Sequence, residues 1–166
     1  MIFFKPLVLI STIFLSMSQT ITISNASQQD FIPVMRELVR AYQAFASYDA
    51  AGYRESGLTV PQADVIFTLG NTAGLTFKEI GELTLITKGT LTGVIDRLEA
   101  KGIVRRITQA DDRRCTRVEL TVKGEKIFAR EFPRQIAYIK QRFDRLSNSE
   151  LAQLHTTLKK LRLAFE

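Results

Sequence analysis

Five hydroxyl and cationic side chains gather in one helix-forming segment, where they could bind a polyanion. They are Thr87, Lys88, Thr90, Thr92 and Arg97. The first turn of a helix has backbone N–H groups without intrahelical partners, and these attract phosphate oxygens. Hydroxyl and ammonium groups beside them can contact phosphates and base edges together. These residue types at this spacing therefore favour nucleic-acid binding.

The segment from Thr87 to about Lys101 is predicted to be an amphipathic helix with a slim outer face. Its apolar residues fall at positions i, i+3, i+4 and i+7 and would form one buried face: Leu91, Val94, Ile95 and Leu98. The opposite face carries Gly89 and Gly93, and each glycine weakens a helix by about 1 kcal/mol relative to alanine. Because a major groove accepts a helix with a slim polar face, the glycines indicate a close approach to DNA.

After Gly102 the pattern changes from helical to alternating. Residues 103–107 and 116–120 predict two paired strands, joined by a hairpin loop at 108–115. This wing carries Arg113 and Arg114, and guanidinium groups suit the narrow, electronegative minor groove of A·T-rich DNA. We expect Asp112 to stabilise the wing by pairing with Arg114. The alternative for the two arginines is a solvated run of charge.

The sequence offers little for other kinds of site. One cysteine, Cys115, excludes an intrachain disulfide, and with one histidine there is no set of zinc ligands. We find no phosphate-binding loop, dinucleotide glycine motif or nucleophile elbow. No pair of carboxylates stands in an apolar context that would suit acid–base catalysis. We therefore predict no enzymatic activity, no cofactor and no metal. A redox role for Cys115 stays open beside that of a passive thiol.

Positive charge is concentrated in the segment that carries these motifs. The chain has a formal net charge of +6 over 166 residues. Residues 87–117 contribute +4 of it, with four acidic side chains against eight basic ones: Lys88, Arg97, Lys101, Arg105, Arg106, Arg113, Arg114 and Arg117. A basic segment of this kind suits a polyanionic partner.

The N-terminus conflicts with a DNA-binding function. Residues 2–15 are strongly apolar, and Ser24-Asn25-Ala26 resembles a small-x-small cleavage site, as in a secretory signal peptide. The apolar run is short for a membrane span, and Pro6 interrupts it. We expect the working protein to begin at Met17, with residues 1–16 as an upstream extension. The alternatives are an extension that packs against a dimer, and a membrane tether or export signal.

Three capping-box patterns mark helix starts, each a hydroxyl residue followed three positions later by Gln or Glu. They are Thr59 with Gln62, Thr76 with Glu79, and Ser147 with Glu150. Two longer helices are predicted at about 29–53 and 122–143, the second disturbed near Pro133.

The final helix has apolar residues three and four positions apart: Leu151, Leu154, Leu158, Leu161 and Phe165. This heptad-like spacing would either cover the protomer's own core or contribute to a dimer interface. We favour the dimer interface, formed by Leu151, Leu154, Leu158 and Leu161.

Together these motifs closely resemble the MarR family of bacterial winged helix-turn-helix transcriptional regulators. The resemblance lies in Leu58-Thr59 with Gln62, in residues 88–106, in Asp112-Arg113-Arg114, in residues 118–124, and in the start of the final helix. It covers about residues 29–166. The first long helix lacks the cysteine that the peroxide-sensing branch of the family uses, so that branch is not expected.

The resemblance implies a mainly α fold with a small β-hairpin wing (α+β). A winged helix-turn-helix lobe at 59–121 would join an N-terminal dimerisation helix at 29–58 and C-terminal dimerisation helices at 122–166, with an apolar extension at 1–28. It also implies that the five residues of the recognition helix and the two wing arginines contact DNA. A pocket between the dimerisation helices and the lobe would accept small, often aromatic or anionic, effectors.

We therefore predict a cytoplasmic, sequence-specific transcriptional regulator that binds a pseudo-palindromic operator in double-stranded DNA as a homodimer, without a membrane partner. Repression relieved by a small-molecule effector is the expected outcome, although the sequence does not exclude activation. A sequence-indifferent nucleoid binder and a membrane-tethered or exported helical interaction module remain as alternatives.

Overall fold

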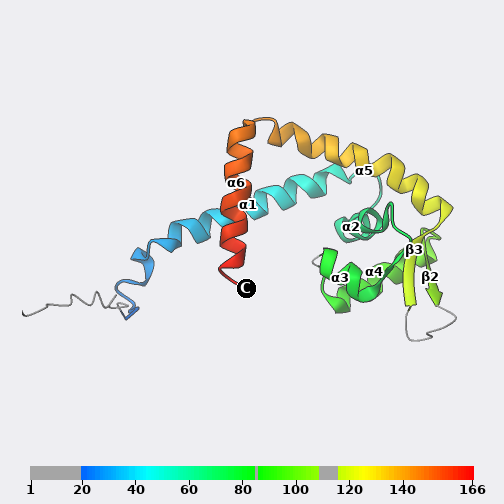
Figure 1. Cartoon of the computed structure of the whole chain (residues 1–166), viewed down its shortest axis with the longest axis horizontal. Helices are drawn as coiled ribbons and strands as arrows, with labels where there is room; N and C mark the ends of the chain where they lie inside the picture. Colours follow the sequence, from blue (N-terminus) through cyan, green and yellow to red (C-terminus); the bar gives the residue numbers. More distant parts are fainter. Residues whose placement is uncertain (1–19, 85, 109–115) are drawn as a thin grey trace, which may run out of the picture. The chain divides into compact units, whose positions relative to one another are not determined.

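The computed structural model describes residues 20–84, 86–108 and 116–166, which are mainly helical with one small sheet (Figure 1). The chain divides into two compact units, Met1–Arg40 and Ala41–Glu166. The described part of the first unit is a 3₁₀ turn, η1 (Ala26–Gln28), and the beginning of helix α1 (Phe31–Gly52). Apolar side chains on this part of α1, such as Phe31 and Leu38, are exposed.

The second unit contains the rest of α1 and all later elements. In chain order these are α2 (Val60–Leu69), β1 (Leu75–Thr76), α3 (Phe77–Thr84), α4 (Lys88–Ala100), β2 (Val104–Thr108), β3 (Thr116–Leu120), α5 (Val122–Phe143) and α6 (Asn148–Leu163). Helices α2, α3 and α4 gather beside the sheet (Figure 1). This is the mainly α architecture with a small β element that the sequence predicts.

The core of the second unit lies where α2, α3 and α4 meet the sheet. Apolar residues from every one of these elements are fully buried, including Ile66, Ile80, Ile95, Val104 and Val118. Phe128 extends this cluster onto α5. Burial of such side chains supplies most of the free energy that holds the helices against the strands. The core therefore fixes the position of α4, the helix that carries the DNA-binding candidates.

All three predicted capping boxes are confirmed. The backbone N–H of Thr59 donates to Gln62 (3.3 Å), that of Thr76 to Glu79 (2.7 Å), and that of Ser147 to Glu150 (2.7 Å). The hydrogen bond from the Thr76 backbone is the main reason that the pKa of Glu79 lies below its usual value. These caps satisfy N–H groups that a helix start otherwise leaves without partners.

The sheet has three antiparallel strands in the order β1-β3-β2, one more than the sequence predicts. Strand β1 pairs with β3, with Leu75 opposite Val118. The guanidinium of Arg117 donates to the carbonyl of Gly74 and so holds this edge. A strand of two residues is too short to show an alternating pattern, which explains why it was missed.

Helix α5 continues through Pro133 without a break, and the predicted disturbance near this residue stays a prediction. A proline inside a helix removes one hydrogen bond, here the one to the carbonyl of Ala129. Ala129 is exposed, so water can satisfy that carbonyl.

Helix α6 buries none of its residues, and Leu154 and Leu158 are 41% and 46% exposed. The apolar spacing of α6 is therefore not explained by cover for this protomer's own core. Phe165 was predicted to extend that spacing, but the helix ends at Leu163, where the N–H of Ala164 closes the last turn onto Lys160 and Leu161.

Within the described ranges, no helix combines the length and the hydropathy that a bilayer span requires.

Candidate nucleic-acid interface

Helices α3 and α4 form a helix-turn-helix whose second helix is amphipathic, as predicted. Thr87 caps α4, and its carbonyl accepts the first helical hydrogen bond from the N–H of Leu91 (2.9 Å). The four apolar residues of α4 are all buried: Leu91, Val94, Ile95 and Leu98. Gly102 ends the helix with φ +65°, a conformation that favours glycine.

The five candidate DNA-contacting residues of α4 are all exposed: Thr87, Lys88, Thr90, Thr92 and Arg97. The hydroxyl of Thr87 donates to that of Thr90 (3.0 Å), so the two lie side by side at the helix start. Within the described part of the chain, neither Lys88 nor Arg97 forms an ion pair. Their charges are therefore available to a partner.

The two glycines on the same helix are not required by packing inside the described chain. A Cβ added at Gly89 would meet nothing within 4 Å, and one at Gly93 would meet first the guanidinium of Arg97 at 3.7 Å, an ordinary contact. Alanine would fit at both positions and would favour the helix. Their presence is explained if the outer face of α4 must approach another molecule closely.

Arg106 of β2 joins the strand to both helices of the motif. It forms ion pairs with Asp96 and Glu99 of α4, and its guanidinium lies 5.5 Å from the centre of the Phe77 ring on α3. The hydrogen bond to Asp96 and the nearby charge of Glu99 raise the pKa of Arg106. Arg106 thus neutralises two acids that would otherwise repel phosphate and holds α4 against the sheet.

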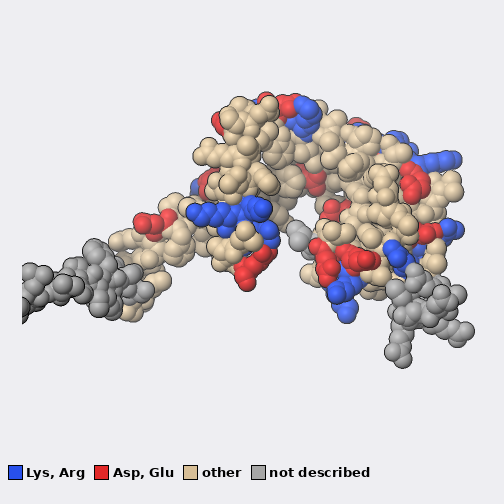
Figure 2. All heavy atoms as spheres, in the orientation of Figure 1, with Lys and Arg blue, Asp and Glu red and all other residues tan. Residues whose placement is uncertain are grey.

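Two further basic residues of the charged segment are engaged within the lobe. Arg105 pairs with Glu119 across the β2–β3 ladder, and Arg117 binds the Gly74 carbonyl. Basic and acidic side chains are interspersed over the face shown in Figure 2. The sequence count of positive charge therefore overstates what is available to DNA, because Arg105, Arg106 and Arg117 serve the fold.

The alternation in β2 was a usable signal for Arg106. Val104 is buried and Arg106, two residues later, is partly buried, whereas Arg105 between them is exposed. Side chains two apart on a strand share a face. The alternation therefore predicts that the side chain of Arg106 lies on the same face of β2 as Val104, toward the helices.

The base of the wing is a regular antiparallel ladder. Strands β2 and β3 pair from Val104 opposite Leu120 to Thr108 opposite Thr116. The predicted wing residues Asp112, Arg113 and Arg114, and also Cys115, lie outside the described residues. Their roles remain predictions.

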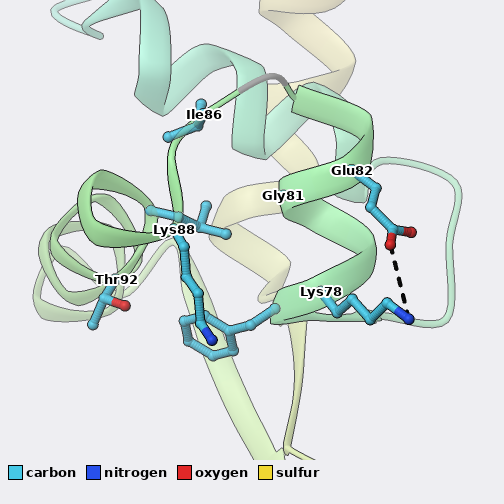
Figure 3. Close-up of a pocket in the computed structure, with 8 residues that line it drawn as sticks. Lys78, Gly81, Glu82, Ile86, Lys88 and Thr92 are labelled. Atoms are coloured by element: carbon cyan, nitrogen blue, oxygen red, sulfur yellow. Dashed lines mark ion pairs between the residues drawn. The ribbon is translucent and has the colours of Figure 1, made fainter. Parts of the chain in front are cut away.

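A hollow of about 600 Å³ lies in the angle between α3 and α4 (Figure 3). Lys88 and Thr92 line it from α4, and Lys78 and Glu82 line it from α3, where they form an ion pair of 3.9 Å. Figure 3 shows Lys88 extending into this angle. Two of the predicted site residues therefore border open space that another molecule can enter.

Comparison with known proteins decides the family. The model of the MarR family matches residues 56–114. The HTH-type transcriptional regulator YfiV of Bacillus subtilis is 30% identical over 118 residues, which are 71% of this chain and 74% of YfiV. The chain belongs to the MarR family.

Solved structures agree with that assignment. BpsR of Bordetella bronchiseptica superimposes with a TM-score of 0.70 at 26% identity, covering 78% of this chain and 98% of BpsR. The S. aureus MepR–DNA complex gives the same TM-score at 20% identity, covering 78% of this chain and 96% of MepR, and shows the shared fold. The predicted winged helix-turn-helix fold and the resemblance to MarR regulators are both confirmed.

This MarR-family regulator has a second cavity, of about 580 Å³, bordered by α1, α2, α5 and the α3–α4 turn. Two carboxylates line it, Asp49 from α1 and Asp64 from α2. The side-chain amide of Gln135 on α5 donates to the carboxylate of Asp49 (2.7 Å) and to its carbonyl (3.1 Å). Tyr53 is buried beside them.

The cavity contradicts one expectation from the sequence. Burial is the main cause that raises the pKa of Asp64, and the negative charge of Asp49 raises it further. Burial is also the main cause that raises the pKa of Tyr53, and the charges of Asp49 and Asp64 add to it. A pair of carboxylates in a partly apolar setting therefore exists. It was missed because Asp49 and Asp64 lie on different helices and only the tertiary fold brings them to one cavity.

Proposed function

We propose that this MarR-family regulator binds duplex DNA as a homodimer, with α4 of each protomer in a major groove and the wing beside it in a minor groove. The outer face of α4 supports the proposal most directly. It presents five exposed hydroxyl or cationic side chains, together with two glycines that internal packing does not require. A face of this kind fits a groove and can donate to phosphates and base edges.

Two symmetric copies of α4 would enter successive major grooves, about 10 base pairs apart. The operator is then a pseudo-palindrome flanked by A·T-rich steps, where Arg113 and Arg114 of the wing would enter the minor groove. MepR, which shares the fold, has been solved as a DNA complex. Such a protein acts where the chromosome is, so the proposal places it in the cytoplasm.

The dimer would be held by helices outside the lobe. Exposed apolar side chains lie on α6, where Leu154 and Leu158 stand one turn apart, with Leu151 and Leu161 partly buried on either side. A row at this spacing can pack against the same row of a second protomer. We therefore assign these four leucines to the dimer interface.

Regulation would come from the second cavity. Its wall includes Leu83, Thr84 and Ile86, which belong to the end of α3 and the turn before α4. A ligand that prefers one arrangement of this turn shifts the population of dimer shapes and so changes DNA affinity. For BpsR, 6-hydroxynicotinic acid is described as the regulator of DNA binding. We propose repression that a small molecule relieves.

The relatives are transcriptional regulators, and we propose no enzymatic activity. In the ranges that the structure describes, no group of three or more His, Cys, Asp or Glu side chains could hold a metal ion.

The test is selection of preferred sites from random duplex DNA by the purified protein, followed by affinity measurements across a salt series. We expect one pseudo-palindromic site, with an affinity that falls steeply as salt rises. Lys88→Gln should weaken binding to every sequence and reduce the salt slope by about one. Lys126→Gln, which removes the charge of an exposed lysine on α5, outside the helix-turn-helix, is the control.

The wing is tested by exchanging Arg113 and Arg114 together for alanine. Tight operator binding should be lost while the dimer persists in sedimentation. Unchanged affinity would remove the wing from the mechanism. Equal affinity of the wild-type protein for random and selected DNA would instead support a sequence-indifferent nucleoid protein.

A further inference from the structure

We infer that the cavity bordered by α1, α2, α5 and the α3–α4 turn selects a cationic aromatic effector, such as an amine attached to an aromatic ring. This inference rests on the proposed function, in which that cavity holds the effector, and it names the chemical class. It differs in charge from the anionic effectors that the family resemblance often implies. Three observations carry it: the aromatic lining, the sign of the charges, and the unequal engagement of the two carboxylates.

The lining of the cavity suits a flat aromatic group. Four aromatic side chains line it: Tyr42 and Phe45 of α1, Tyr53 directly after α1, and Phe67 of α2. Isoleucines of α5 close the opposite side. At about 580 Å³ the space matches the usual size of small-molecule sites. Ring faces also attract cations, most strongly when water is excluded.

The charges that face the cavity are negative. Asp49 and Asp64 both line it, and no Lys, Arg or His stands among the described lining residues. Two arginines of α5 that do not line the cavity have partners of their own, since Arg134 pairs with Glu131 and Arg142 lies over the Tyr48 ring. An anion entering here would be repelled by two carboxylates and would find no cation to pair with. A cation would be attracted by both.

The two carboxylates are not equally engaged. Asp49 accepts a hydrogen bond from Gln135, whereas no hydrogen bond or ion pair to Asp64 arises from the residues described. Asp64 is half-buried, and desolvation of its charge is unfavourable unless a partner compensates. A bound ammonium group would supply that partner. Asp64 is therefore the residue we expect to contact the cation, with Asp49 adding to the field.

The cavity also connects such a ligand to the DNA-binding helix. Thr84, which lines it, donates from its hydroxyl to the carbonyl of Ile80 (2.8 Å), and the N–H of Ile86 reaches the same hydroxyl (3.4 Å). Ile86 also lines the hollow next to Lys88. An occupant that displaces Ile86 therefore acts on the segment from which α4 starts.

The experiment uses three probes with one ring and different charge: 2-naphthylmethylamine, 2-naphthylmethanol and 2-naphthylacetate. The chain contains no tryptophan, so naphthyl fluorescence reports binding directly. Calorimetry gives each Kd, and operator release by each probe is measured in parallel. We expect the Kd of the amine to be at least about tenfold lower than that of the acetate, with the Kd of the alcohol between them.

Asp64→Asn should weaken binding of the amine about tenfold and leave the alcohol unchanged, because the variant removes charge and keeps shape. Asp49→Asn should have a smaller effect in the same direction. Glu125→Gln, which removes an exposed acid of α5 that does not line the cavity, is the matched control and should leave all three affinities unchanged. Circular dichroism melts establish that each variant is folded.

Each result decides between the two proposals. Acetate binding as tightly as the amine overturns the charge inference and leaves the effector proposal standing. An amine preference that survives in both aspartate variants places the probe elsewhere and also overturns the inference. If none of the three probes binds at millimolar concentration, the inference is overturned. The operator affinity measured in the same samples tests DNA binding by α4 independently.

Discussion

Arg106 of strand β2 forms an ion pair with Asp96 of helix α4, so the base of the wing and the recognition helix are joined by a charged contact. Glu99 accepts from the same guanidinium, and Phe77 lies beneath it. The side chain of Arg106 is only 29% exposed. An arginine that touches two helices and a strand at once determines the angle at which α4 is presented.

We predict that Arg106→Gln lowers the free energy of unfolding by about 1–2 kcal/mol, because two acids lose their partner. Operator affinity should fall as well, since Asp96 and Glu99 would then repel phosphate. Chemical denaturation and DNA titration measure the two effects. Arg105→Gln is the control, because Arg105 is mostly exposed and its pair with Glu119 should contribute about 0.5 kcal/mol or less.

Gly93 should show opposite effects on stability and on DNA binding. Gly93→Ala places a methyl group where the nearest neighbour is 3.7 Å away, so the helix should gain about 0.5–1 kcal/mol. Operator affinity should fall at least about tenfold if this face enters the groove. Gly81→Ala in α3 has a similarly open position and should stabilise the lobe with a smaller effect on DNA. Tighter DNA binding by the Gly93 variant would contradict the assigned face.

Gly124 is required for a different reason, which is close packing against backbone. A Cβ there would collide with the carbonyl oxygen of Ile103, which accepts hydrogen bonds from Thr121, and would lie 3.2 Å from Cβ of Leu120. We predict that Gly124→Ala costs about 1–3 kcal/mol of stability despite its higher helix propensity. Thermal melting compares it with Gly89→Ala, where the added Cβ meets nothing within 4 Å.

Local signals predicted the elements of the lobe well. The capping residues, the apolar face of α4 and the ends of α5 all depend on side chains within one or two helical turns, and each was found where expected. The site residues of α4 follow from the same periodicity, because a helix with one buried face must expose the other. Thr92 is exposed for that reason.

Features that depend on contacts between elements could not be predicted in this way. Arg106 and Asp96 stand ten residues apart, and their pairing requires β2 to fold back along α4. Asp49 and Asp64 meet only because α1 and α2 border the same cavity. Charge counted along a sequence does not distinguish an arginine that binds DNA from one that holds a strand. Arg105 and Arg117 were therefore counted in the basic segment although both are engaged within the lobe.

The dimer interface is tested on α6. Leu154→Glu combined with Leu158→Glu should give monomers in sedimentation, because two charges would be buried in an apolar interface. Operator affinity should fall strongly, since each half-site would then bind independently. Thr156→Glu adds a charge on the other side of the same helix and should leave the dimer intact. A dimer that survives the double leucine exchange would refute the interface.

Asp64 should make the stability of the ligand-free protein fall as pH rises. Its pKa is raised in the folded state, first by burial and then by Asp49, above the ordinary value of 3.8. The folded protein therefore binds a proton more readily than the unfolded chain between those two pKa values, so its stability is lost as pH increases through that window.

Asp64→Asn removes the titration. We expect the variant to match the wild type in denaturation midpoint below pH 4 and to exceed it at pH 7. Adding 2-naphthylmethylamine should raise the wild-type midpoint more than that of Asp64→Asn at pH 7, because the wild type binds the amine about tenfold more tightly. The contrary result is a wild type that proves as stable as Asp64→Asn, or more stable, at pH 7 without ligand. That result would show that the half-buried carboxylate of Asp64 already has a partner and needs no bound cation.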